Sequence, residues 1–122
     1  MTDFNLVVLY VNDSDASSAF YRELLERPIV QASPKFAMLP LGKETMLGLW
    51  QREAVEPRAG HEIGGTEVVF NVANAEAVRT THEAWKARGL KIAQAPTATV
   101  FGQTFVALDP DGHRLRVLAP AA

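Results

Sequence analysis

The two halves of the chain repeat one order of predicted elements, and this repeat constrains the fold more than any other feature. Residues 5–11 and 66–72 are dense in β-branched and aliphatic side chains, as in buried strands. A shift of 61 positions superposes these segments and places Asp13 on Asn74, and each of these two residues is a good helix N-cap. We interpret the repeat as a duplication of one strand–helix–strand–strand–strand module.

The first predicted helix follows Asp13. Ala16, Phe20 and Leu24 are spaced by one helical turn and predict its buried face. Pro28 ends the helix, because the residue before a proline avoids helical dihedral angles.

The second predicted helix runs from Asn74 to about Arg88. Val78, Thr81 and Trp85 predict its inner face, and Gly89 lies at the expected C-terminal stop.

Short strands are predicted after each helix, at 36–39, 45–50, 91–94, 104–108 and 114–118. Asp109 to Gly112 (Asp-Pro-Asp-Gly) forms a strong turn sequence before the last strand. A shift of 69 positions places Phe36 on Phe105 and Leu47 on Arg116. This shift is eight positions longer than the shift of 61 that relates the first strands and helices. The second module should therefore hold eight extra residues, near 96–103.

These modules predict one domain, with module one at about 1–52, a linker at about 53–64 and module two at about 65–122. One helix covers one face of each sheet, so the other face must meet a second sheet, a partner chain or a ligand. Strand alternation assigns three groups of residues to this open face: Leu6, Val8 and Tyr10; Glu67, Val69 and Asn71; Arg114, Arg116 and Leu118.

The composition excludes several classes of protein. Twelve basic and 14 acidic residues give a formal charge of −2, which argues against a nucleic-acid binder. No apolar run approaches the roughly 18 residues of a membrane span. The N-terminal residues lack the pattern of a signal peptide, so we expect a cytoplasmic protein. With no cysteine, a disulfide framework or a thiol nucleophile is excluded.

Several segments resemble the vicinal oxygen chelate superfamily, which includes glyoxalase I, bleomycin-resistance proteins and extradiol dioxygenases. They are residues 9–13, 19–22 and 109–112, together with the duplicated module. A further resemblance, to the phenazine antibiotic-resistance subgroup, rests on residues 9–11, 49–50, 100–102, 104–105, 109–113 and 116–117. The resemblance implies an α+β fold in which two βαβββ modules form a curved eight-stranded mixed sheet around a cleft, usually completed by a homodimer.

Metal-using members of the superfamily carry His or Glu ligands at four positions, which here align with Leu6, Leu47, Glu67 and Arg116. A divalent ion needs three or more oxygen or nitrogen ligands, and a guanidinium beside it would repel it. We therefore expect no metal and no cofactor.

Four aromatic residues are candidate ligand-binding residues: Trp50, Phe36, Phe101 and Tyr10. Trp50 either stacks on a ligand or belongs to the core. With Leu47 on the open face, strict alternation turns Trp50 away from it unless a bulge intervenes beside Gly48. Phe36 is either core or a second wall of the site, and Phe101 is either a surface residue or a lid over a ligand. Tyr10 either donates an orienting hydrogen bond or lies at a surface.

Arg116, Glu67 and Asn71 are the polar candidates. Arg116 either pairs with Glu67 or receives a ligand carboxylate through a bidentate contact. Asn71, like Tyr10, either donates an orienting hydrogen bond or lies at a surface. The three histidines share no metal-binding spacing, and surface positions are predicted for His61, His82 and His113.

The sequence and the resemblance together predict a metal-free binding protein that sequesters a phenazine-like aromatic antibiotic, without catalytic residues or turnover. Its partners would be that small molecule and a second copy of the chain, not a nucleic acid or a membrane. Two alternatives stay open. One is a metal-dependent lyase, isomerase or dioxygenase-like enzyme of the same fold, and the other is a small regulatory or interaction module.

Overall fold

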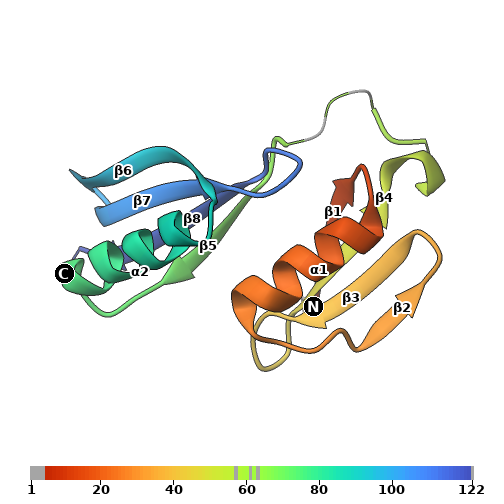
Figure 1. Cartoon of the computed structure of the whole chain (residues 1–122), viewed down its shortest axis with the longest axis horizontal. Helices are drawn as coiled ribbons and strands as arrows, with labels where there is room; N and C mark the ends of the chain where they lie inside the picture. The colour runs from red at the N-terminus through yellow and green to blue at the C-terminus, as the bar shows by residue number, and fades with distance from the viewer. Residues whose placement is uncertain (1–4, 57, 61, 63, 122) are drawn as a thin grey trace, which may run out of the picture. The chain divides into compact units, whose positions relative to one another are not determined.

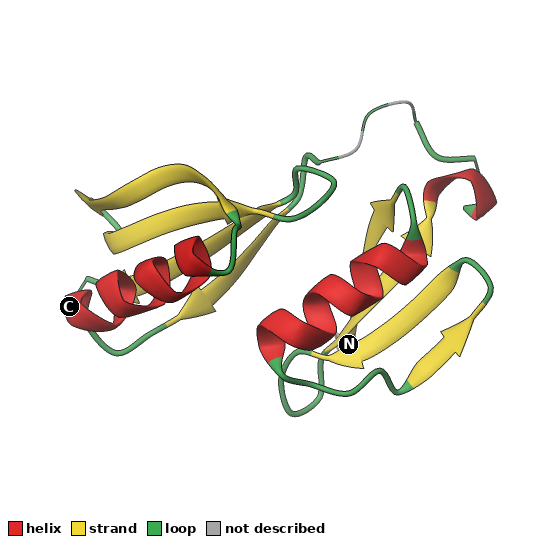
Figure 2. Cartoon of the chain, viewed as in Figure 1, coloured by secondary structure: helices red, strands yellow, loops and turns green. Residues whose placement is uncertain are grey.

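The computed structural model describes residues 5–56, 58–60, 62 and 64–121. The chain divides into two compact units, Met1–Ile63 (unit one) and Gly64–Ala122 (unit two). Each unit consists of one four-stranded sheet with one long helix on a single face (Figure 1 and Figure 2).

Unit one contains a βαβββ module followed by one short helical turn. Its strand order is β1-β4-β3-β2, in which β1 and β4 are parallel and the other neighbours are antiparallel. The elements are β1 (Leu6–Val11), α1 (Ser14–Leu25), β2 (Gln31–Ser33), β3 (Phe36–Pro40), β4 (Met46–Gln51) and η1 (Arg52–Ala54). No range had been predicted for β2, a three-residue strand without an apolar alternation.

Unit two repeats this topology in the order β5-β8-β7-β6, with β5 and β8 parallel. The elements are β5 (Glu67–Asn71), α2 (Ala75–Ala87), β6 (Lys91–Thr99), β7 (Gly102–Leu108) and β8 (Arg114–Pro120). The predicted α+β class with two βαβββ modules is confirmed.

The pairing of the strands shows that the predicted shift of 69 positions between the later strands of the two modules is wrong by one residue. Leu6 pairs with Met46 in unit one, and its counterpart Glu67 pairs with Arg114 in unit two. The corresponding strands are therefore related by 68 positions and not by 69. Gly48, rather than Leu47, is the counterpart of Arg116, and the insertion is one residue shorter than predicted. The error arose because a one-residue slip leaves each strand apolar while exchanging its two faces.

The buried face of α1 also differs from the prediction. Its buried residues are Ser14, Ser17, Tyr21 and Leu24, whereas Ala16 is exposed and Phe20 is only half-buried. The two serines are nearly inaccessible, and Tyr21 is fully buried. A search for apolar residue types alone overlooks small polar residues on a packed face.

Both predicted N-caps are present. The side chain of Asp13 accepts hydrogen bonds from the backbone N–H groups of Asp15 and Ala16, and Asn74 accepts one from Ala77. These contacts satisfy N–H groups that have no partner within the helix. Gly89, with φ at +90°, follows the end of α2 as predicted.

The core of unit two contains a histidine that was predicted at the surface. His82 is buried on α2 with Val78 and Trp85, and its ring packs edge-on against Phe105 at 5.3 Å between centroids. The predicted inner-face residue Thr81 is only half-buried.

His113 is likewise buried, at 2% exposure, so its predicted surface position is wrong. Its backbone N–H donates to a side-chain oxygen of Asp109, and its carbonyl accepts from the Asp109 N–H. These two hydrogen bonds span the turn at 109–112, and the His113 side chain that follows the turn is buried. His61 lies outside the described residues.

The predicted open faces lie opposite the helices in both units. In unit one Leu9 and Val11 are buried while Leu6 and Tyr10 are exposed. In unit two the same alternation buries Leu115 and leaves Glu67, Val69, Asn71 and Arg114 exposed.

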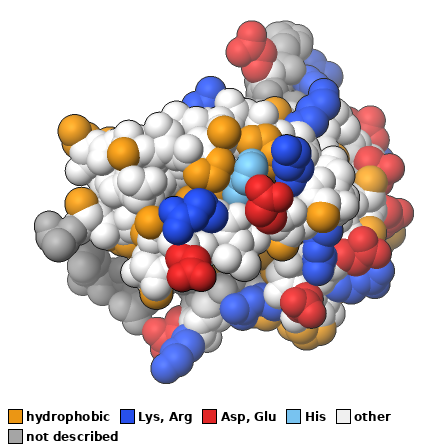
Figure 3. All heavy atoms as spheres, turned by 60° about the vertical axis from the view of Figure 1, so that its left-hand side comes forward, with side chains coloured by type: hydrophobic (Ala, Val, Ile, Leu, Met, Phe, Trp, Pro, Cys, Tyr) orange, Lys and Arg blue, Asp and Glu red, His pale blue; other side chains and the backbone are white. Residues whose placement is uncertain are grey.

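In the part of the chain that the structure describes, no helix has both the length and the apolar character needed to cross a membrane. On the face drawn in Figure 3, basic and acidic side chains are interspersed. This pattern agrees with the nearly balanced charge of the chain.

The β6–β7 hairpin of unit two depends on Gly102. Its φ of +133° lies in the region that favours glycine, and an added Cβ would overlap the carbonyl oxygen of Ala119. The hairpin therefore lies tightly against the end of β8, where the Ala121 N–H donates to the Phe101 carbonyl.

We predict that Gly102→Ala lowers the free energy of unfolding by about 2 kcal/mol or more, because both the backbone conformation and the contact with β8 are lost. Gly42→Ala is the matched control, since nothing lies within 4 Å of an added Cβ there, and it should change stability by less than about 0.5 kcal/mol. Urea denaturation of both variants measures the difference, and equal effects would contradict the prediction.

Candidate functional site

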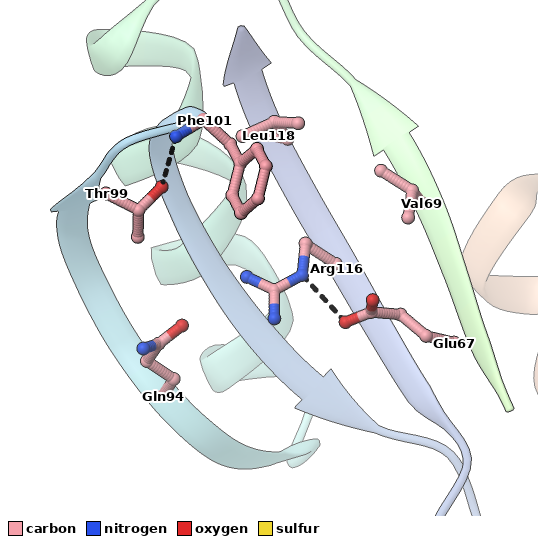
Figure 4. Close-up of a pocket in the computed structure, with 7 residues that line it drawn as sticks. All are labelled: Glu67, Val69, Gln94, Thr99, Phe101, Arg116 and Leu118. Carbon is pink, nitrogen blue, oxygen red and sulfur yellow. Dashed lines mark hydrogen bonds and ion pairs between the residues drawn. The ribbon is translucent and has the colours of Figure 1, made fainter. Parts of the chain in front are cut away.

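A pocket of about 410 Å³ lies on the open face of unit two (Figure 4). Small-molecule sites usually occupy about 300–1,000 Å³, so the volume suits a small ligand. The lining side chains come from β5, β6, β8 and the β6–β7 turn; they are Glu67, Val69, Gln94, Thr99, Phe101, Arg116 and Leu118.

Arg116 is the central polar group of the pocket. Its Nε donates to Oε1 of Glu67 at 2.7 Å, and its Nη1 donates to Oγ1 of Thr104 at 3.2 Å. Thr104 is fully buried and donates in turn to the Val117 carbonyl at 2.8 Å. The guanidinium is thus held from two strands, and one of the two predicted alternatives, the Arg116–Glu67 pair, is present.

Apolar side chains border this pair. Val69 and Leu118 come from the same face of β5 and β8. In Figure 4 their side chains lie next to the ion pair, toward the ring of Phe101. The arrangement joins an apolar surface to a single charged pair, as is typical of sites that bind a mostly apolar molecule and orient it through a few polar contacts.

Gln94 reaches the pocket because β6 is irregular. The β6–β7 register shifts between Ile92 and Gln94 and again before Thr97. In regular alternation Gln94 would share the face of Ile92, but the shift pairs Gln94 with Val106 on the open side. Figure 4 shows Gln94 across the guanidinium of Arg116 from Glu67.

Phe101 is held at the tip of the β6–β7 hairpin. Thr99 Oγ1 accepts from the Phe101 N–H at 3.1 Å and donates to the Gly102 carbonyl at 2.8 Å. The Phe101 side chain lines the pocket although the residue is 74% exposed, and its neighbour Val100 is 88% exposed. Because the backbone of the tip is fixed by several bonds, little ordering is needed before the ring can contact a ligand.

Three aromatic residues cluster on the open face of unit one. Trp50 contacts Tyr10 edge-on at 6.5 Å between ring centroids and Phe36 at 6.3 Å. The three residues lie side by side in register on β1, β4 and β3. Leu47 is buried on the helix side, so regular alternation places Trp50 on the open face, and β4 needs no bulge.

The predicted site residues therefore fall into two groups. Glu67, Arg116 and Phe101 line the pocket of unit two, and Tyr10, Phe36 and Trp50 form the cluster in unit one. Asn71 lies exposed on β5 and does not line the pocket.

The sequence-based selection missed four lining residues: Val69, Gln94, Thr99 and Leu118. Alternation had already placed Val69 and Leu118 on the open face, so their neighbours Glu67 and Arg116 could have indicated them. The position of Gln94 follows from the irregular register and had no comparable signal.

The model of the glyoxalase/bleomycin resistance protein/dioxygenase superfamily matches residues 3–117. The chain belongs to this superfamily. It is 30% identical over 117 residues to the phenazine antibiotic resistance protein EhpR of Enterobacter agglomerans, a match that covers 93% of this chain and 88% of that protein.

Several solved structures have the same fold as this chain. The solution structure of protein ATC0852 from Agrobacterium tumefaciens matches with a TM-score of 0.90 and 44% identity, over 100% of both chains. A glyoxalase/bleomycin resistance protein/dioxygenase family enzyme from Burkholderia phytofirmans PsJN matches with a TM-score of 0.81 and 25% identity, over 98% of this chain and 100% of that one.

The metal-ligand positions of the superfamily do not fit a metal here. With the corrected register they fall on Leu6, Gly48, Glu67 and Arg116, of which only Glu67 offers a ligand atom. Its carboxylate is already bonded to the guanidinium of Arg116. The described residues also contain no group of three or more His, Cys, Asp or Glu side chains that could hold a metal ion.

We predict that the Glu67–Arg116 pair contributes little to stability, because the side chains are 37% and 25% exposed. A double-mutant cycle with Glu67→Gln and Arg116→Gln, measured by urea denaturation, should give a coupling energy of about 0.2–1 kcal/mol. A coupling of several kcal/mol would instead mean that the pair is a structural element of the sheet.

Proposed function

We propose that this protein binds and sequesters a planar aromatic antibiotic of the phenazine type, without a metal or a catalytic step, and thereby confers resistance. The observation that carries the proposal is the pocket of unit two, in which apolar walls and the exposed ring of Phe101 border one fixed guanidinium. The similarity to the phenazine antibiotic resistance protein EhpR over most of both chains supports the ligand class.

The chemistry of the pocket favours binding over turnover. Of its lining residues, Glu67 alone has a side chain that could act as a general base, and Arg116 already occupies one of its oxygens. Proton abstraction would have to use the other oxygen while the bond to Arg116 is held. In a sequestering protein, by contrast, the same pair serves as a fixed polar contact for a bound molecule.

We further propose a cytoplasmic homodimer. The partly exposed apolar residues Leu6 and Tyr10, on the open face of unit one, support association with a second copy. Sedimentation over a range of concentrations tests this association.

We predict that phenazine ligands raise the melting temperature of the dialysed protein. A ligand at 100 times its dissociation constant adds about 2.7 kcal/mol to the free energy of unfolding. Phe101→Ala should weaken binding about threefold to tenfold through lost ring contacts, and Arg116→Gln about tenfold or more through the lost charged donor.

Arg79→Gln is the charge-matched control, since Arg79 is exposed on α2, on the other side of the sheet. It should bind like the unaltered protein. Calorimetric titration measures all four proteins. No binding across a panel of phenazines, or equal binding by all variants, would overturn the proposal.

The assignment of Trp50, Phe36 and Tyr10 to the ligand stays a prediction with its own test. The chain has two tryptophans, of which Trp85 is buried in the core of unit two. If Trp50 stacks on the ligand, phenazines quench the fluorescence of the unaltered protein, and Trp50→Phe removes most of that quenching. Undiminished quenching in this variant would exclude Trp50 from the site.

A further inference from the structure

The charge of Arg116 is already compensated before any ligand arrives. Its Nε lies 2.7 Å from Oε1 of Glu67, and both side chains line the same pocket. Arginine carries five N–H groups, and here Nε and one N–H of Nη1 are engaged. The other N–H groups of Nη1 and Nη2 have no partner among the described residues. The pocket therefore offers donors on Arg116 beside an acceptor on Glu67, with no net charge.

A ligand carboxylate would fit this pair poorly. To reach Arg116 from the pocket it would approach the Glu67 carboxylate as well, and both side chains are partly removed from water, which weakens the screening between like charges. Placing like charges side by side in this way disfavours binding of the carboxylate.

A neutral group with an acceptor and a donor side by side fits the pair better. Its oxygen could accept from Arg116 while its N–H donates to the second oxygen of Glu67. Gln94, on the other side of the guanidinium in Figure 4, can accept or donate and so imposes no charge of its own.

We propose that the pocket selects aromatic ligands whose polar substituent is a neutral, planar donor–acceptor group, such as a primary carboxamide, over the corresponding carboxylate. Glu67 is the residue that sets this preference. The inference rests on the proposed function and assigns the class of substituent recognised at Arg116.

The test compares phenazine, phenazine-1-carboxamide and phenazine-1-carboxylate by calorimetric titration at neutral pH. With the unaltered protein we expect the carboxamide to bind about tenfold more tightly than the carboxylate, a difference of about 1.4 kcal/mol. Glu67→Gln keeps the shape of the side chain but leaves Arg116 with an uncompensated charge. In this variant the carboxylate should become the tighter ligand of the two.

Glu76→Gln is the matched control, because Glu76 is an exposed carboxylate on α2, away from the pocket. It should keep the preference of the unaltered protein. Melting curves of each variant confirm that it is folded before titration.

The outcomes separate the two proposals. If none of the three phenazines binds, the proposed function fails. If phenazines bind but the unaltered protein prefers the carboxylate, or Glu67→Gln leaves the ratio of the two affinities unchanged, the function stands and the assignment of the substituent is overturned.

Discussion

One helix can cover only one face of a four-stranded sheet, and the candidate site depends on this constraint. In each unit α1 or α2 packs on the face that carries the buried residues of the long strands, such as Leu49 in β4 and Val117 in β8. Every second side chain of the same strands points to the opposite, open face. Tyr10, Trp50, Glu67 and Arg116 all lie there, in a position where binding residues can vary without disturbing the core.

The two modules have the same topology but differ on this open face. The position held by Gly48 in unit one carries Arg116 in unit two, and Trp50 corresponds to Leu118. Unit one therefore presents an aromatic cluster and unit two an ion pair with apolar walls. The inserted residues lengthen the β6–β7 hairpin, and this extension supplies Thr99 and Phe101 to the pocket.

Sequence patterns were reliable where they reflect local chemistry. The caps at Asp13 and Asn74, the turn at 109–112 and the alternation along β1, β5 and β8 follow from hydrogen bonding and strand geometry within a few residues. They failed where packing decides. The buried face of α1 includes two serines, and His82 and His113 are enclosed by neighbours that lie far along the chain or by a tight turn. No residue-type rule anticipates these positions.

The sequence by itself determined the duplicated βαβββ order, the class of fold and the open-face position of Glu67 and Arg116, because helix capping and strand alternation act over short distances. Only the tertiary structure decided the register between strands, and with it the correspondence of Gly48 to Arg116 and the open-face position of Trp50. It also decided that Gln94 reaches the pocket through an irregular β6. Register and bulges depend on which strands pair and how they fit together, and that information is not local to any one segment.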